Sequence, residues 1–384
     1  AEPLAATHDE PGPAARTLPP RRAIAADEGS PVFAQLSLPI LLLIFAAAAG
    51  VIWVAGVKLA DTTDVLASRL HLGEALGGIV VLAVATNLPE IAITVSAAAG
   101  GNIGIAVGNI LGGIAIQTVV LVFMDMAMKE RVPLTYRAAS LSLVVEAVLV
   151  VAVLIVAIMA TQLPGDLLAF RLTPGALAIA ALWLVGIWLS SRASRGLPWH
   201  DSAGDAPDTQ EEPKGHSQDK KQAAAAHTTR VFWIFGAAAL ATLVAGVLLE
   251  RSGDAIAERI GVSGVLFGAT ILAAATSLPE LSTGITSVRM KDYQLAISDI
   301  FGGNAFLPVL FLLAVVVSGQ AVLPAAQASD IYLAGLGVLL TCVYAAGLIF
   351  RPRRLFWRVG VDSLAVLVLY AVGVAGLFAI ATHG

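Results

Sequence analysis

The chain has 384 residues, of which 58% are hydrophobic and 13% charged, and its formal net charge at pH 7 is -4. This composition excludes a soluble globular domain and predicts a polytopic, all-α integral membrane protein with no nucleic-acid partner. The net charge says little about partners, because in a membrane protein the positions of the charges matter more than their sum. The single cysteine, Cys342, excludes an internal disulfide and a thiolate metal cluster.

Apolar stretches of about 20 residues are long enough to cross a bilayer, and the chain contains several of that length. The predicted transmembrane helices number ten and lie near residues 34–57, 72–99, 103–128, 138–161, 173–191, 231–250, 262–288, 293–318, 328–349 and 357–381. Residues 1–32 are rich in Pro, Ala and Arg, which predicts a disordered tail without the apolar region of a signal peptide. The polar stretch at 192–230 predicts a flexible linker between two five-helix halves, 33–191 and 231–384.

The Lys and Arg residues predict the orientation of the chain. Of 23 such residues, 17 fall on the side of the linker and six on the other side. The positive-inside rule therefore places the linker in the cytoplasm and both termini outside it. We expect the membrane to be the plasma (inner) membrane.

One heptapeptide occurs twice. ValAlaThrAsnLeuProGlu at 84–90 returns as AlaAlaThrSerLeuProGlu at 274–280, and the offset of 190 holds without gaps over two regions, about 72–128 and 262–318. Copies five spans apart enter the membrane from opposite sides, so they form an inverted-topology repeat. Such repeats place a substrate site near the midplane, between broken helices of the two halves.

The prolines of the two copies predict the breaks. Pro89 and Pro279 lack an N–H, so the carbonyl groups of Ala85 and Ala275 lose their helical partners. An unpaired carbonyl group in hydrocarbon costs several kcal/mol unless a cation, water or a side chain satisfies it.

Oxygen-bearing side chains stand beside both breaks. Each proline is followed by a glutamate, Glu90 or Glu280, and preceded by neutral oxygens; these belong to Thr86, Asn87, Thr276 and Ser277. Oxygen-only ligands are those that hard cations such as Ca2+, Na+ or Mg2+ prefer. The sequence therefore predicts a paired cation site.

The helix after each break adds further candidates. Asn109 and Asp299 occupy the same repeat position, 19 residues beyond their glutamates. Glu90, Glu280 and Asp299 together could balance Ca2+ plus one proton, or several monovalent ions. Gln117 is equally compatible with a ligand role and with packing.

These motifs resemble those of the sodium/calcium exchanger family, the calcium/cation antiporters, in its prokaryotic type. The alpha repeats of that family read GlyThrSerLeuProGlu followed by a GlyAsn…GlySerAsn helix, and the resemblance covers about 50 residues in each half and the five-plus-five layout. It implies a secondary active antiporter that exchanges Ca2+ for Na+ by alternating access. By this resemblance the site comprises Glu90 and Glu280 as principal ligands, with Thr86, Asn87, Thr276, Ser277 and the backbone carbonyls of Ala83 and Ala273 around them.

Some positions depart from the family pattern. Gly113 and Gly303 replace serines, and Gln117 and Leu307 stand where the family has Asn or Asp. The lost groups are ones that the family uses around sodium, so a Ca2+/H+ exchanger, or one for another cation, is the alternative function.

Other classes are less compatible with the chain. A cation channel could also be lined by symmetric carboxylates, and ion flux would distinguish it. An intramembrane protease would need two catalytic aspartates or a HisGluXXHis motif, and the latter is absent from the sequence. We expect no enzymatic activity, no cofactor and no obligatory protein partner; inorganic cations are the expected substrates.

Overall fold

The computed structural model describes residues 31–69, 84–193 and 228–383. The first half contains α1 (Pro31–Gln35), α2 (Leu38–Arg69), α4 (Leu88–Ala99), α5 (Ile103–Ala127), α6 (Leu134–Ala138), α7 (Leu141–Ala160), the 3-10 turn η1 (Gly165–Leu167) and α8 (Pro174–Ala193). The second half begins with α10 (Thr228–Ile260), α11 (Gly264–Phe267), the π-helical η2 (Gly268–Leu272), α12 (Ala273–Thr276) and α13 (Leu278–Arg289). It continues with α14 (Tyr293–Phe306), η3 (Leu307–Val309), α15 (Leu310–Ser318), η4 (Leu323–Ala325), α16 (Ala328–Phe350), the short antiparallel hairpin β1 (Leu355–Phe356) and β2 (Val359–Gly360), and α17 (Val361–His383).

The described residues contain eight helices that are long and apolar enough to cross a membrane, and one bent pair that forms a ninth span. These nine coincide with nine of the ten predicted spans and make the chain an integral membrane protein. The remaining predicted span, 72–99, is represented by the 12-residue α4, because residues 70–83 lie outside the described part. The linker and the tail are outside it as well, so their predicted boundaries remain predictions.

Two helices are longer than their apolar stretches. The first and sixth spans were predicted to end near 57 and 250, whereas α2 continues to Arg69 and α10 to Ile260. In α10 the reason is burial within the protein, because Glu250 at the end of the apolar stretch and Ser252 beyond it are fully buried. A polar segment that packs against another helix continues as helix without contact with lipid.

The predicted helix breaks are present. In the second repeat the helical segments 264–276 and 278–289 meet at an angle of 42° at Ser277. The break precedes Pro279 by two residues, so that the proline lies in the first turn of α13, where a missing N–H costs no hydrogen bond. Pro89 has the same place in α4, after Asn87.

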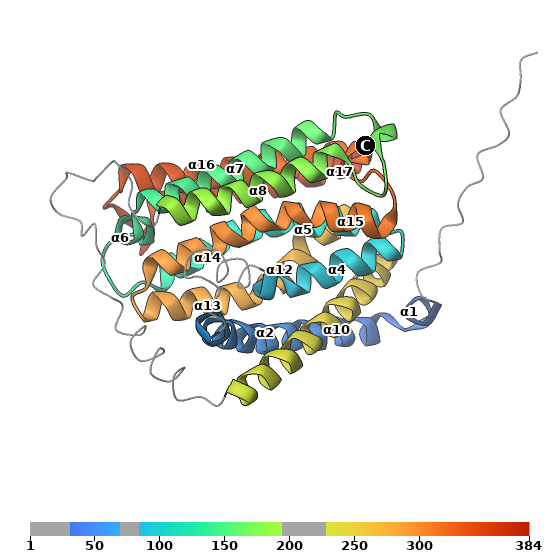
Figure 1. Ribbon diagram of the computed structural model, residues 1–384, viewed down its shortest axis with the longest axis horizontal. Coiled ribbons are helices and arrows are strands. Elements are labelled where there is room, and N and C mark those ends of the chain that lie inside the picture. The colour runs from blue at the N-terminus through green and yellow to red at the C-terminus, as the bar shows by residue number, and fades with distance from the viewer. Residues whose placement is uncertain (1–30, 70–83, 194–227, 384) are drawn as a thin grey trace, which may run out of the picture.

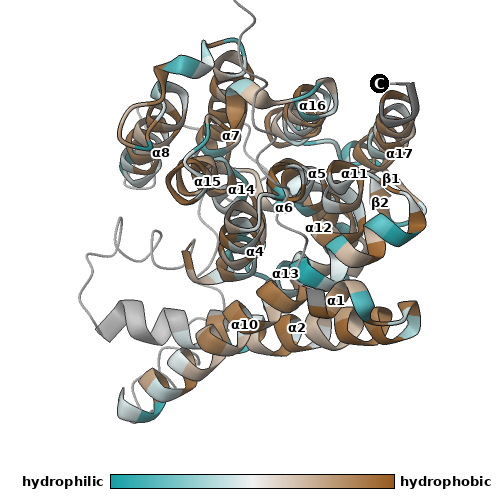
Figure 2. Ribbon diagram, turned by 90° about the vertical axis from the view of Figure 1, so that its right-hand side faces the viewer, coloured by the Kyte–Doolittle hydropathy of each residue, from teal (hydrophilic) through white to brown (hydrophobic). Residues whose placement is uncertain are grey.

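The helices form a layered bundle around α5. In Figure 1, α7, α8, α16 and α17 cover one side of the bundle, and α2 and α10 cross each other on the opposite side. Figure 2 shows hydrophobic residues along most of α2 and α10. The apolar part of α5 is 94% buried inside the protein and that of α10 only 28%, which makes α5 a central helix and α10 a peripheral one.

Glycine allows the central helices to approach closely. A β-carbon on Gly112 of α5 would lie 2.2 Å from the Cα of Ala269, and one on Gly108 would lie 2.5 Å from the carbonyl oxygen of Val265. Small residues at such crossings let two backbones touch, which is how helices associate inside a bilayer. This crossing holds the π-helical segment of the second half against α5 of the first half.

We expect Gly112→Ala to lower the thermal unfolding temperature of the detergent-solubilised protein. The methyl group would meet backbone atoms that cannot rotate away, and such overpacking typically costs about 1–3 kcal/mol. Gly50→Ala is the matched control, because a β-carbon there has no heavy atom within 4 Å. Equal unfolding temperatures for the two variants would show that the crossing is looser than the structure indicates.

Candidate ion-binding site

The two repeat glutamates are buried in the first turns of the half-helices that follow the breaks. Glu90 of α4 has 0% exposure and Glu280 of α13 has 4%. None of their four carboxylate oxygens accepts a hydrogen bond from a described residue. No described Lys, Arg or His forms an ion pair with either of them. Two carboxylates in this setting need a positive species from outside the described residues, or protons.

The glutamates from the two halves lie close enough for their charges to interact. The negative charge of Glu90 acts on Glu280, and the Thr276 hydroxyl of the second half lies beside the Glu90 carboxylate. Asp299 also acts on Glu280. Thr283 connects these two, because its Oγ1 lies 3.2 Å from the Glu280 carbonyl oxygen and 3.2 Å from Asp299 Oδ2. The structure thus brings the three predicted carboxylates into one neighbourhood.

Neutral oxygens collect on one side of the crossing between α5 and α14. A β-carbon on Gly303 would lie 3.4 Å from Gln117 Oε1 and 3.6 Å from Asn87 Nδ2. Gln117 and Asn87 are both buried, at 1% exposure each. Gly303 therefore leaves space beside two amide groups, and we call these three residues the amide corner.

The symmetry-related corner is apolar. A β-carbon on Gly113 would lie 3.3 Å from Leu307 Cδ1, and Leu307 is fully buried. Gly113 and Leu307 are the repeat counterparts of Gly303 and Gln117, at the offset of 190. A β-carbon at either glycine would contact the side chain four residues after the other glycine, but of these two side chains only Gln117 presents an oxygen atom.

The other predicted site residues have separate surroundings. Asn109 is fully buried, and neither its Oδ1 nor its Nδ2 has a described hydrogen-bond partner. Asn87 Nδ2 donates to Thr86 Oγ1 at 3.4 Å.

The backbone carbonyl groups of Ala273 and Ala83 are the remaining predicted ligands. The carbonyl oxygen of Ala273 accepts hydrogen bonds from the hydroxyl groups of Thr276 (3.1 Å) and Ser277 (2.8 Å) and from the Ser277 N–H (3.0 Å), so it is already satisfied. Ala83 lies outside the described residues.

The donor set favours a cation bound by mixed oxygen ligands. Within the described ranges, no three His, Cys, Asp or Glu side chains come close enough to form a compact metal centre. A cation between Glu90 and Glu280 would draw its remaining ligands from hydroxyl and amide oxygens. Flexible oxygen coordination of this kind suits Ca2+ and Na+ better than Zn2+.

The prediction from sequence missed one buried polar link. Asn304 Nδ2 of α14 donates to Thr118 Oγ1 at 3.1 Å and to the carbonyl oxygen of Ile114 at 3.4 Å, both on α5. The repeat comparison did not mark Asn304, because its counterpart is the apolar Ile114. Its place directly after Gly302 and Gly303 was the available signal, since an amide in a transmembrane helix commonly bonds to a neighbouring helix.

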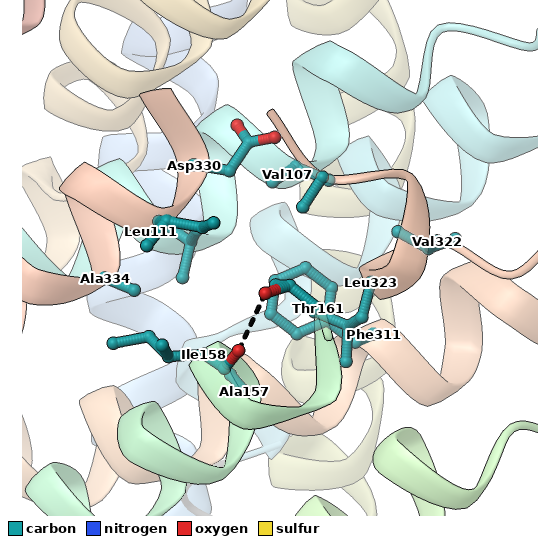
Figure 3. Close-up of a pocket in the computed structure, with 12 residues that line it drawn as sticks. Val107, Leu111, Ala157, Ile158, Thr161, Phe311, Val322, Leu323, Asp330 and Ala334 are labelled. Atoms are coloured by element: carbon teal, nitrogen blue, oxygen red, sulfur yellow. Dashed lines mark hydrogen bonds between the residues drawn. The ribbon is translucent and has the colours of Figure 1, made fainter. Parts of the chain in front are cut away.

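The described cavities lie elsewhere. Figure 3 shows a pocket lined by apolar side chains such as Val107, Leu111 and Phe311, in which Thr161 donates to the carbonyl oxygen of Ile158. Its free volume of about 10 Å³ holds about one water molecule. A larger hollow of about 600 Å³ lies between α2 and α10 and has an almost entirely apolar lining. Neither cavity includes Glu90 or Glu280.

Comparison with known proteins identifies one matching family. The sequence model described as sodium/calcium exchanger protein matches residues 40–194 and 230–378. CaxA of Alkalimonas amylolytica is 37% identical over 76 residues, which are 20% of this chain and 23% of CaxA. The inner membrane protein YrbG of Escherichia coli (strain K12) is 34% identical over 80 residues, which are 21% of this chain and 24% of YrbG. The chain thus matches less than a quarter of the length of these two relatives.

Solved structures share the fold. The H+/Ca2+ exchanger CAX superposes with a TM-score of 0.61 at 14% identity, covering 88% of this chain and 87% of that one. The sodium-calcium exchanger NCX_Mj superposes with a TM-score of 0.56 at 16% identity, covering 88% and 98%. YfkE superposes with a TM-score of 0.55 at 14% identity, covering 91% and 98%. At these identities the likeness concerns the fold alone.

We expect Gly303→Ala to weaken cation binding and Gly113→Ala to leave it nearly unchanged. Both variants should keep or slightly raise the unfolding temperature, because Ala favours a helix interior over Gly by about 0.8–1.0 kcal/mol. Only the first places a methyl group against oxygen atoms at the amide corner. Calorimetric titration of the solubilised variants with Ca2+ and Na+ measures the difference. Equal affinities would show that the amide corner takes no part in binding.

Proposed function

The chain belongs to the sodium/calcium exchanger protein family, and on this premise we propose that it is a secondary active antiporter of the inner membrane that exchanges Ca2+ for Na+. The observation that carries the proposal is the pair Glu90 and Glu280. These carboxylates come from two inverted halves, are buried in the bundle close enough for their charges to interact, and have no cationic partner among the described residues. Together they balance the charge of one Ca2+ ion.

Charge explains why such a site exchanges ions. Two bare carboxylates are costly to enclose in a low-dielectric interior, whereas a pair that holds a divalent cation is nearly neutral. The protein with a cation bound therefore switches the ion site from one side of the membrane to the other more readily than the protein with an empty site. Ca2+ moves one way, a competing ion returns through the same oxygens, and the two halves alternate around a fixed site.

Na+ requires neutral oxygens beyond the two glutamates. The neutral oxygen ligands available for a cation are the amide oxygens of Asn87 and Gln117 at the amide corner and the hydroxyl oxygens of Thr276 and Ser277. Their mixture of amide and hydroxyl oxygen matches the hard-cation preference for oxygen ligands. This set supports Na+ as the counter-ion.

One observation favours H+ as a second candidate. Leu307 fills the apolar corner where a second set of neutral oxygens would otherwise lie against Gly113. A proton needs only a carboxylate, so two protons on Glu90 and Glu280 would replace one Ca2+ ion without any further ligand.

We expect Glu280→Gln and Glu90→Gln each to abolish Ca2+ uptake and to weaken Ca2+ binding by roughly a hundredfold, which corresponds to about 2.7 kcal/mol. Each substitution keeps the size of the side chain and removes one of the two balancing charges. The matched control is Glu258→Gln, because Glu258 is exposed. Radioactive Ca2+ uptake into proteoliposomes and calorimetric titration measure the two effects. Unchanged uptake and affinity in Glu280→Gln would overturn the proposed ligand role.

Ca2+ uptake driven in turn by an outward Na+ gradient and an outward proton gradient identifies the counter-ion. Uptake with the Na+ gradient alone supports the primary proposal, and uptake with the proton gradient alone supports the second candidate. A Ca2+ current that needs neither gradient would indicate a channel and contradict exchange.

A further inference from the structure

The helices α2 and α10 form a pair that contacts the broken helices through glycine. The pair lies on one side of the bundle (Figure 1, Figure 2). A β-carbon on Gly56 of α2 would lie 2.6 Å from Pro279 Cβ, and one on Gly246 of α10 would lie 2.7 Å from Ala92 Cβ and 3.1 Å from the carbonyl oxygen of Pro89. Gly56 and Gly246 are repeat counterparts. The same close glycine contact is therefore made twice, once with each half-helix that carries a glutamate.

Polar contacts reinforce the contact of α10 with α4 at one end. Ser96 Oγ of α4 donates to Glu250 Oε2 at 2.6 Å, and Asn102 Nδ2, in the turn after α4, donates to Asp254 Oδ2 at 2.9 Å. Arg251 Nε lies 3.4 Å from the same oxygen of Glu250. We call the Glu250–Ser96 and Asp254–Asn102 pairs the α10 latch. Hydrogen bonds with an ionised acceptor are among the stronger ones in a protein interior.

Glu250 is unusual for a membrane helix. It is fully buried, and its Oε1 has no described hydrogen-bond partner. An ionisable side chain within a membrane span is costly and by default functional. The neighbouring Arg251 supplies a positive charge, which disfavours a second cation site here and favours a mechanical role.

The residue pairs of the latch are not repeated in the sequence at the symmetry-related place. The counterpart of Glu250 is Ala60, and the counterpart of Ser96 is Thr286, whose hydroxyl donates to the carbonyl oxygen of Ser282 at 2.9 Å. The counterpart of Asn102 is Asp292, which accepts from the N–H of Leu295 at the start of α14. An alanine side chain has no acceptor and an aspartate has no amide donor, so these residues cannot repeat the two hydrogen bonds of the latch in the same form.

We propose that the α10 latch closes the bundle on the side of the Gly100–Asn102 turn and must open whenever the ion site becomes accessible from that side. The proposal rests on the exchange function proposed above, in which one part of an inverted repeat moves against the other. Glycine contacts, which have no interlocking side chains, permit packed helices to slide. A hydrogen-bonded pair at one end stabilises the arrangement that is closed on that side over the arrangement that is open there. The latch thereby biases which side of the membrane the resting protein faces.

Glu250 is in this sense a positioning residue. It acts through Ser96 on α4, and α4 carries Pro89 and Glu90 at its other end. A substitution of Glu250 therefore changes the rate of transport through α4, without any contact between residue 250 and the ion. The distribution of Lys and Arg predicts that the latched side is extracytoplasmic.

The first test measures access to the site without measuring transport. Thr94 is fully buried on α4, one turn beyond Glu90, and Thr94→Cys in a Cys342→Ser background provides a single thiol. A membrane-impermeant maleimide is added on the side of the Gly100–Asn102 turn. We expect Glu250→Ala and Ser96→Ala each to accelerate labelling about threefold or more, because each shifts the population towards the open arrangement. Thr286→Ala, at the counterpart position that lacks the latch, should label at the parental rate.

The second test holds the latch shut. The pair Ser96→Cys and Glu250→Cys in the Cys342→Ser background is bridged by a short bifunctional thiol reagent that a reductant cleaves. We expect bridging to slow Ca2+ exchange by about tenfold or more and reduction to restore it, while the solubilised protein keeps its Ca2+ affinity.

The outcomes separate the two proposals. Exchange at the unbridged rate after bridging, or unchanged labelling in both Glu250→Ala and Ser96→Ala, would overturn the latch. Absence of Ca2+ exchange in the unbridged protein would overturn the exchange function, and the labelling rates would still decide whether the latch closes that side.

Discussion

The repulsion between two buried carboxylates is the constraint on which this structure depends. Glu90 and Glu280 are held inside a bundle of apolar helices without a basic partner among the described residues. Enclosing such groups is costly unless a cation or a proton compensates for them. The broken helices, the glycine-mediated crossings and the hydroxyl groups around Thr276 are the means by which the chain brings these carboxylates together and leaves oxygen atoms available.

The pseudo-twofold relation between the halves is visible in a single hydrogen bond. Asn304 donates to the carbonyl oxygen of Ile114, which is its own counterpart in the repeat. A contact between equivalent positions can occur only near the pseudo-symmetry axis, so α5 and α14 cross there. At each of the two corners, a β-carbon on one glycine would contact a side chain of the other repeat, Gln117 at Gly303 and Leu307 at Gly113.

The two repeats differ in the side chains that they place at equivalent positions. One corner presents the amide of Gln117 and the other a methyl group of Leu307, and Glu250 of α10 accepts a hydrogen bond from the neighbouring half-helix at a position where α2 has an alanine. An exchanger built from identical halves would have no intrinsic preference for either side of the membrane. Differences in a few side chains can supply that preference, because each side chain stabilises one of two otherwise equivalent arrangements.

Patterns along the chain are enough to predict the class of protein, nine spans that the structure also shows, the two helix breaks and the repeated glutamates. These features can be predicted without knowledge of tertiary contacts, because hydropathy, proline geometry and the exact offset of 190 are properties of the linear sequence. The folded structure is needed to show that Leu307 lies against Gly113, that Asn304 joins α14 to α5 and that Glu250 accepts a hydrogen bond from Ser96, 154 residues away. The physical reason is that a repeat identifies the counterpart of a residue, whereas the packing of the folded helices decides its neighbour.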